Sequence, residues 1–353
     1  MERKQHLSTN SKNTVYFITL FFFVVCLIGC AQAPSPKQVP SDLVWPLPPE
    51  IPRIKYIASI SSEEDVSGPK KRSFKDWLLG EDPRKVIRRL KKPHGLCTDS
   101  KGRIYVADSQ QGVVFVFDRK NRKVAFIGQS GAGRLSGPIG VAVDPNDNVY
   151  VSDPKRKNVY VYGPNGKFKF TLGREGEFIN PAGLAVDRAR GRVLVVDSKA
   201  HKVRVYTTRG KFVTEFGERG NGEGQFNFPT HIAVGEDGFV YVVDTINFRV
   251  QVFDQDYKYY DDFGFAGDRP GQFARPKGIA LDSDNNIYVV DAGFNNFQIF
   301  NQDYQVLLAV GEGGSEPGQF WLPAGICIDR DDYIYVSDAY NRRVQIFKYL
   351  KQK

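Results

Sequence analysis

The stretch from Pro323 to Asp338 reads Pro-Ala-Gly-Ile-Cys-Ile-Asp-Arg-Asp-Asp-Tyr-Ile-Tyr-Val-Ser-Asp, and close copies of it recur five times upstream. Each copy opens on a proline and closes on an aspartate, with 43 to 48 residues between prolines and 44 to 47 between aspartates. The prolines are Pro93, Pro138, Pro181, Pro229, Pro276 and Pro323, and the aspartates are Asp108, Asp153, Asp197, Asp244, Asp291 and Asp338. A period of this length, filled with short β-branched and aromatic runs between Gly, Asn and Asp, is typical of propeller blades.

Each copy predicts four strands. A short apolar run follows the proline, as in residues 140–143, and predicts a buried inner strand that ends at a tight turn. An alternating run such as residues 104–107 predicts the second strand, a third follows the closing aspartate, and a fourth ends at a glycine. We therefore expect an all-β protein, a six-bladed β-propeller of four-stranded antiparallel blades over residues 93–350.

The sixth copy is short of one strand, because the sequence reaches Lys353 soon after its third. A blade left in that state would expose a sheet edge. The run from Ile54 to Ile60 resembles the other fourth strands. We expect residues 51–60 to supply the missing strand and to close the ring.

The repeat itself resembles a known family. Pro-x-Gly-hydrophobic-Ala-hydrophobic-Asp, then Tyr-Val-x-Asp, then Asn-x-Arg-Val, is similar to the NHL repeat of the TolB-like propeller superfamily. The full Asn-x-Arg-Val element stands in the fourth copy, at Asn247, and in the sixth, at Asn341. The resemblance covers roughly residues 51–350 and implies a six-bladed propeller that acts as a binding module. Function still has to be argued from a site, because one fold serves many functions.

The N-terminus predicts export. A polar stretch with three basic residues precedes an apolar run of signal-peptide length, which ends at Leu27-Ile28-Gly29-Cys30. This tetrapeptide resembles the bacterial lipobox, so residues 1–29 are expected to be a lipoprotein signal peptide and Cys30 the lipidated residue. The other interpretation is an uncleaved membrane anchor. Residue 31 is Ala, not Asp, which resembles outer-membrane lipoproteins, and the proline-rich residues 30–50 are expected to form a tether.

Residues 61–92 interrupt the repeat and are predicted to be a basic, partly helical insertion. The basic residues at its C-terminal end, which are predicted to form a basic surface, are Arg84, Lys85, Arg88, Arg89, Lys91 and Lys92. A basic amphipathic segment can bind anionic headgroups or an acidic partner. The alternative is that its apolar side packs on a blade rim while the charges remain in water.

Residues suited to catalysis are scarce. Pro93-His94-Gly95-Leu96 resembles one histidine motif of the zinc-dependent peptidyl-hydroxyglycine lyases. The matching positions in the other copies are Ile139, Ala182, Thr230, Lys277 and Ala324. Two of the three histidines of a three-ligand zinc site are therefore missing, and His231 lies one residue further on, where strand alternation turns it to a different face. His94 and His231 remain a possible tunnel-mouth site, and no cofactor is predicted.

Cys97 and Cys327 occupy the same repeat position, four residues after the proline, in the first and sixth copies. Ring closure makes these blades neighbours, so a disulfide between them could staple the ring of an exported protein. The alternative is that cysteine replaces alanine as a small buried residue.

Two repeated features are predicted to be structural. The closing aspartates are expected to accept backbone N–H bonds in the following turn. Phe226, Phe273 and Phe320, each in a Gly-Gln-Phe triplet, are expected to fill the gaps between adjacent blades.

Together these features favour a lipid-anchored envelope propeller that binds another envelope protein or a polymer without catalysis. The alternative is a metal-dependent lyase or lactonase with its site at the central tunnel. The formal charge of +9 would suit RNA, but the export signal argues against a nucleic-acid partner.

Overall fold

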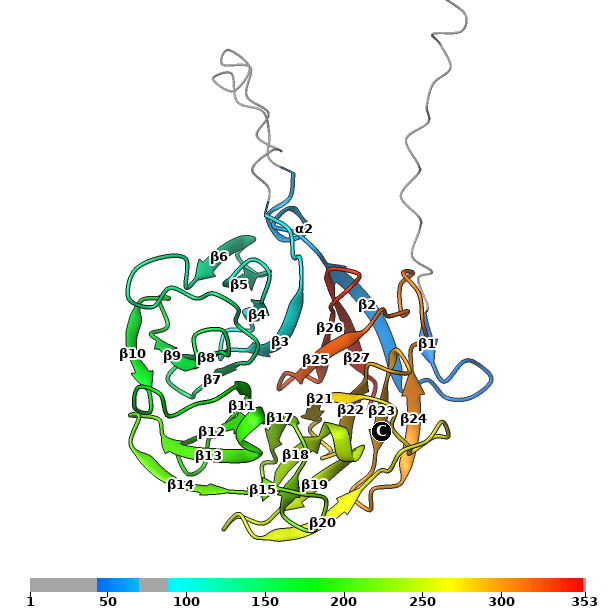
Figure 1. The fold of residues 1–353 in the computed structure, drawn as a ribbon. Coiled ribbons are helices and arrows are strands. Elements are labelled where there is room, and N and C mark those ends of the chain that lie inside the picture. Colours follow the sequence, from blue (N-terminus) through cyan, green and yellow to red (C-terminus); the bar gives the residue numbers. More distant parts are fainter. Residues whose placement is uncertain (1–42, 70–87, 352–353) are drawn as a thin grey trace, which may run out of the picture. The chain divides into compact units, whose positions relative to one another are not determined.

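The computed structural model describes residues 43–69 and 88–351. Within this part of the chain, six antiparallel sheets are arranged in a ring (Figure 1), which confirms the all-β six-bladed propeller. The innermost strand of each blade begins at or just after a repeat proline. The prolines and closing aspartates therefore mark the same two points in every blade.

The first three blades each contain four strands in chain order. Their strands are β3 (Pro93–Thr98), β4 (Ile104–Asp108), β5 (Val113–Asp118) and β6 (Lys123–Ile127); β7 (Val141–Val143), β8 (Val149–Asp153), β9 (Asn158–Tyr162) and β10 (Phe168–Leu172); and β11 (Pro181–Asp187), β12 (Arg192–Asp197), β13 (Lys202–Thr207) and β14 (Phe212–Phe216).

The fourth and fifth blades repeat this order, and the sixth draws on both ends of the domain. Their strands are β17 (Pro229–Val234), β18 (Val240–Asp244), β19 (Arg249–Phe253) and β20 (Tyr259–Phe263); β21 (Pro276–Leu281), β22 (Ile287–Asp291), β23 (Asn296–Phe300) and β24 (Val306–Val310); and β25 (Pro323–Ile328), β26 (Tyr333–Asp338), β27 (Arg343–Tyr349), β2 (Ile54–Ile60) and β1 (Val44–Trp45).

The ring closes as the sequence predicts. β2 pairs antiparallel with β27, from Ile54 opposite Tyr349 to Ile60 opposite Val344. The structure adds a fifth strand, β1, which pairs with the outer side of β2 and lies inside the range predicted to be tether. Trp45 packs edge-to-face on Phe347, with ring centroids 5.7 Å apart, so burial of this indole explains why the end of the tether joins the sheet.

The hydrophobic core lies between neighbouring blades. One cluster, for example, joins Ile60 and Val344 of the sixth blade to Phe115 of the first. The three Gly-Gln-Phe phenylalanines are fully buried in such clusters, which confirms their predicted structural role. Burying one Phe side chain contributes roughly 1.5–3 kcal/mol, so these phenylalanines help hold adjacent blades together.

Short elements complete the described chain. They are α2 (Glu64–Ser67), the 3-10 turns η2 (Ser198–Ala200) and η3 (Thr245–Asn247), and the parallel pair β15 (Glu218–Arg219) and β16 (Gln225–Phe226). Residues 70–87 of the predicted insertion, with Arg84 and Lys85, fall outside the described residues. None of the helices found over residues 43–69 and 88–351 is long and apolar enough to cross a bilayer.

Candidate functional site

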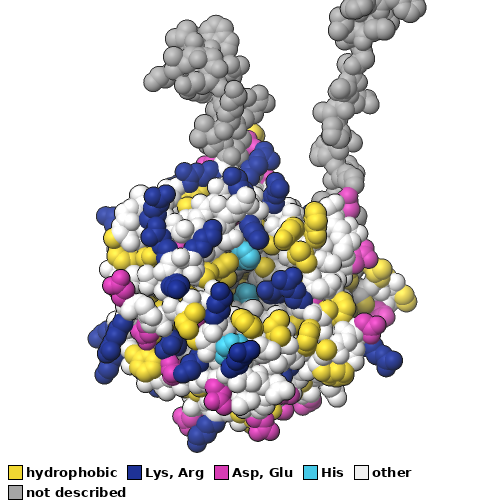
Figure 2. All heavy atoms as spheres, in the orientation of Figure 1, with side chains coloured by type: hydrophobic (Ala, Val, Ile, Leu, Met, Phe, Trp, Pro, Cys, Tyr) yellow, Lys and Arg dark blue, Asp and Glu magenta, His cyan; other side chains and the backbone are white. Residues whose placement is uncertain are grey.

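The proline end of the blades forms one face of the propeller, which we call the histidine face. Each repeat proline pairs with, or lies close to, the closing aspartate at the end of the second strand. Three sets of residues therefore meet at this end around the tunnel: the pair before each proline, the residue after it, and the four-residue loop after each closing aspartate. Figure 2 shows histidine side chains in and near the hollow at the centre of one face, with lysine and arginine side chains around it.

The histidine face is basic at its centre. The three sets of residues hold nine lysines and arginines and no aspartate or glutamate beyond the closing aspartates themselves. The nine are Lys91, Lys92, Lys155, Arg156, Lys157, Lys199, Arg275, Lys277 and Arg342. Acidic side chains on the loops between blades are engaged locally, as Glu177 is with the Tyr206 hydroxyl at 2.8 Å.

The closing aspartates fix the loops of the histidine face through hydrogen bonds. All six are buried and accept backbone N–H bonds from the pair that precedes the repeat proline, as Asp153 does from Ser136 at 2.6 Å and from Gly137 at 3.1 Å. Asp108, Asp153 and Asp291 also bond the following turn, which confirms that part of the prediction. The sequence did not predict the bond back across the blade, which fixes the loops of the histidine face.

Apolar side chains are also exposed on these loops. They are Ile179, Phe228, Ile246, Trp321 and Tyr340. Trp321 and Tyr340 pack together with ring centroids 5.5 Å apart, and the Lys92 ammonium lies 5.8 Å from the Tyr340 ring centroid. Aromatic and cationic groups side by side are typical of protein recognition surfaces.

His94, His231 and Lys277 form the centre of the candidate site. Burial is the main cause that lowers the pKa of His94 to about 4 and that of His231 to about 3. The positive charge of Lys277 contributes to both values, and that of Lys92 contributes at His94. Burial, followed by the charge of Arg275, lowers the pKa of Lys277 to about 8. His94 also acts on His231, so blades one, four and five place three basic groups within electrostatic reach of each other.

The two histidines stand at different levels of the tunnel. His231 lines the central cavity of about 790 Å³, whereas His94 and Lys277 lie one repeat position nearer the histidine face and do not. Lys277 was noted in the sequence only as a missing histidine. The signal that could have identified Lys277 is its charge, at a repeat position where most other copies hold a small or apolar residue.

The donor set does not resemble a metal centre. Over the described ranges 43–69 and 88–351, no group of three His, Cys, Asp or Glu side chains is placed to hold a metal ion. Residues 282–286 hold four aspartates and asparagines, but Asn286 donates to the Asp282 carboxylate within one hairpin turn. These residues do not fit a zinc or calcium site.

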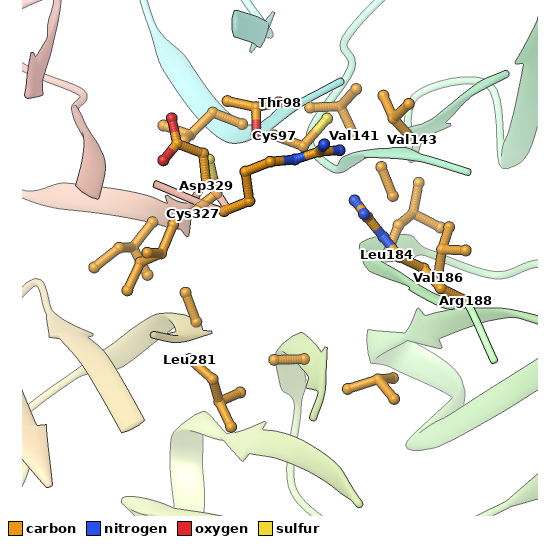
Figure 3. A pocket seen from close by; sticks show the side chains of 18 of the residues that line it. Cys97, Thr98, Val141, Val143, Leu184, Val186, Arg188, Leu281, Cys327 and Asp329 are labelled. Carbon is orange, nitrogen blue, oxygen red and sulfur yellow. The ribbon is translucent and has the colours of Figure 1, made fainter. Parts of the chain in front are cut away.

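Cys97 and Cys327 both line the central cavity, as Figure 3 shows, and both are free cysteines. The possible bridge between them is not formed in the structure. Burial raises the pKa of each thiol, and the charge of Arg188 from the third blade partly opposes this shift at Cys97. Each therefore fits the small buried position that alanine fills in the other blades.

Four of the predicted basic surface residues of the insertion are described: Arg88, Arg89, Lys91 and Lys92. The Arg88 guanidinium lies 4.4 Å from the Phe126 ring centroid, and the Arg89 guanidinium lies 3.8 Å from the Glu64 carboxylate. The backbone N–H groups of Lys91 and Lys92 donate to Asp108, which makes these two residues part of the histidine face.

Comparison with known proteins agrees with the repeat and the blades. The NHL repeat family matches residues 90–117, 178–206, 226–253, 273–300 and 320–347. The chain is an NHL-repeat six-bladed β-propeller.

Similar proteins share only part of this NHL-repeat chain. Protein brain tumor of Drosophila melanogaster is 35% identical over 60 residues, which is 17% of this chain and 6% of that protein. The E3 ubiquitin-protein ligase NHLRC1 of Homo sapiens is 31% identical over 67 residues, which is 19% of this chain and 17% of the ligase. The match thus spans less than a fifth of either relative.

Solved structures share the fold of this propeller at low identity. A streptogramin B lyase has a TM-score of 0.56 and 12% identity, over 74% of this chain and 94% of its own. An auxiliary nutrient binding protein from Bacteroides thetaiotaomicron has a TM-score of 0.59 and 16% identity, over 74% of this chain and 70% of its own. The fold therefore occurs in an enzyme and in a binding protein. A function for this chain has to be argued from its candidate site.

Proposed function

We propose that this NHL-repeat propeller is a non-catalytic binding module of the bacterial cell envelope, tethered to the membrane through a lipid on Cys30. It binds an acidic envelope protein or an anionic envelope polymer through the histidine face. The observation that carries the proposal is the charge around the tunnel, where the three sets of residues hold nine basic side chains and, apart from the buried closing aspartates, no acidic one.

Charge and apolar surface act together in this proposal. A basic face speeds and orients the approach of an acidic partner, and fixed loops lose little entropy when the partner binds. Trp321 and Tyr340 supply the aromatic anchors that dominate many interfaces. The closing aspartates, by holding the loops, keep these anchors in place before the partner arrives.

The test is site-specific photocross-linking in cells that carry the chain. A photoreactive residue at Trp321, on the histidine face, is compared with one at Tyr260, which is exposed on the outer strand β20. We expect a discrete cross-linked envelope partner from position 321 and background from position 260. Equal products from both positions, or a nucleic-acid adduct from position 321, would count against the proposal.

The lipid anchor is tested separately. Cys30→Ala removes the thiol that the lipobox-like motif presents, so the variant is expected to leave the membrane fraction while the propeller keeps its fold. A variant that stays with the membrane would favour the uncleaved anchor.

A metal-dependent lyase or lactonase is the second candidate, because His94 and His231 lie within electrostatic reach of each other at the tunnel. The third group there is Lys277, which at neutral pH is a poor metal ligand because its amine is protonated. Stoichiometric zinc or calcium in the purified protein, lost in a His94→Ala and His231→Ala double variant, would favour this enzyme.

A further inference from the structure

Glycine occupies the second position after the repeat proline in five of the six blades, at Gly95, Gly140, Gly183, Gly278 and Gly325. A Cβ on Gly95 would lie 2.5 Å from the backbone oxygen of Ile139, and one on Gly140 would lie 2.3 Å from that of Ala182. No real side chain tolerates such contacts. The inner strands therefore pass each other backbone to backbone around the tunnel at this level.

The fourth blade breaks this rule with His231. The Cα of His231 lies 2.6 Å from where a Cβ on Gly183 would stand, so the glycine of the third blade makes room for it. An imidazole thus enters a ring that the other blades leave free of side chains. The substitution calls for a role other than packing.

The His231 ring is left without partners. Both ring nitrogens are buried, and neither has a hydrogen-bond partner over the described residues 43–69 and 88–351. Buried polar groups in native proteins are nearly always bonded to protein, water or a ligand. The side chain lines the central cavity, so a molecule in that cavity could accept a hydrogen bond from it.

The charged groups around His231 indicate the charge of the molecule that could bind there. The groups that shift its pKa are Lys277 and His94, and those that shift the pKa of His94 are Lys92 and Lys277, all of them basic. No carboxylate contributes to either shift. An anionic group at this end of the cavity would therefore lie near the positive charge of Lys277 and away from the carboxylates, which line the opposite end.

The side chains that line the cavity indicate the chemistry of the rest of the ligand. From His231 towards the C-terminal ends of the inner strands, aliphatic side chains line the cavity, and Figure 3 shows several of them around the space. They include Val141, Val143, Leu184, Val186 and Leu281. Charged side chains, among them Asp99, Arg188 and Asp329, line the opposite end of the cavity, so the aliphatic wall lies between two polar ends.

We propose that the central cavity binds a small aliphatic carboxylate, with its anionic group at His231 and its hydrocarbon part against the aliphatic wall. Lys277 supplies the attracting charge, and His231 donates a hydrogen bond from its neutral ring. This small-molecule site goes beyond the docking of a partner on the histidine face and does not depend on it.

Calorimetric titration of the full-length chain with hexanoate tests the proposal. Hexan-1-ol has the same hydrocarbon part without the charge, and acetate has the charge without the hydrocarbon part. We expect one hexanoate per chain and at least tenfold weaker binding of hexan-1-ol and of acetate. Hexanoate that binds no better than hexan-1-ol would overturn the anionic site, and inorganic phosphate that binds when hexanoate does not would overturn the carboxylate assignment.

Three variants locate the site. His231→Gly restores the residue that the other five blades carry, and Lys277→Met keeps the length of the side chain without its charge. Each is expected to weaken hexanoate binding at least tenfold, whereas Lys258→Met, at an exposed position outside the tunnel, leaves it unchanged. Unchanged affinity in both tunnel variants would overturn the proposal.

A spectroscopic readout separates ligand contact from mere structural support. Saturation with hexanoate should raise the pKa of the His231 ring, followed by NMR of the imidazole and assigned with His231→Gly. A ring whose pKa does not respond to bound hexanoate would contradict contact. If hexanoate does not bind but photocross-links form at position 321, the small-molecule site is wrong and the docking proposal stands. If hexanoate binds but no photocross-links form at position 321, the docking proposal is wrong and the small-molecule site stands.

Discussion

The hydroxyl of Ser337 in β26 donates a hydrogen bond of 2.5 Å to the backbone oxygen of His94 in β3. It crosses the seam at which the sixth blade meets the first. Ser152 makes the same bond to the backbone oxygen of Ala182, between the second and third blades. The tunnel residue His94 is therefore positioned by the closure of the ring.

Replacing Ser337 by Ala should lower the free energy of unfolding by about 1–2 kcal/mol, because it leaves a buried carbonyl oxygen without this donor. Ser152→Ala should cost a similar amount, since the bond is equivalent. Chemical denaturation compares both with Ser130→Ala at an exposed position, where no loss is expected. A neutral Ser337→Ala would mean that the seam does not depend on this bond.

Closure by β2 can be tested within that one strand. Tyr56 is buried and packs edge-to-face on Phe347, with ring centroids 5.6 Å apart, whereas its neighbour Ile57 is exposed. Tyr56→Ala should lower the free energy of unfolding by about 3–5 kcal/mol, and Ile57→Ala by less than about 1 kcal/mol. Equal losses would contradict the register of β2 against β27.

Lys277 should cost stability. Its pKa is about 8 in the folded protein and about 10.5 when unfolded, so the unfolded chain binds the proton more tightly. The loss in the free energy of unfolding that Lys277 causes is full below pH 8 and disappears as the pH rises towards 10.5. Lys277→Met should therefore raise the free energy of unfolding at pH 7 by about 2 kcal/mol, with a difference that shrinks between pH 8 and 10.5. A variant that is less stable at pH 7 would show that Lys277 has a structural partner.

The state of Cys97 and Cys327 is settled by alkylation and intact mass. Because burial raises the pKa of both thiols, neither should react quickly in the folded protein. Unfolding without a reductant should let both react. Two unreactive cysteines after unfolding would mean that Cys97 and Cys327 are bridged to each other.

Much of the fold could be predicted because one repeat defines it. The prolines, closing aspartates and terminal glycines bound each strand, and the missing last strand pointed to residues 54–60. β1 could not be predicted in this way, because Val44-Trp45 belongs to no repeat and is held by a contact of Trp45 with Phe347, about 300 residues away in the sequence.

The candidate site could be predicted only in part. His94 and His231 were identified from the sequence, but their electrostatic coupling depends on blades one and four facing a common tunnel. The sequence also shows that His231 replaces a repeat glycine. What it could not show is how close Ile139 and Ala182 come to those glycines, which is the reason that the substitution matters.

The most direct test of the central claim combines the cross-link at position 321 with charge reversal. Lys199→Glu with Arg275→Glu reverses two exposed charges on the histidine face, and Lys211→Glu with Lys258→Glu reverses two exposed charges away from it. We predict that the first pair removes most of the cross-linked partner and that the second pair leaves its yield unchanged. Equal yields from both pairs would contradict binding through the histidine face.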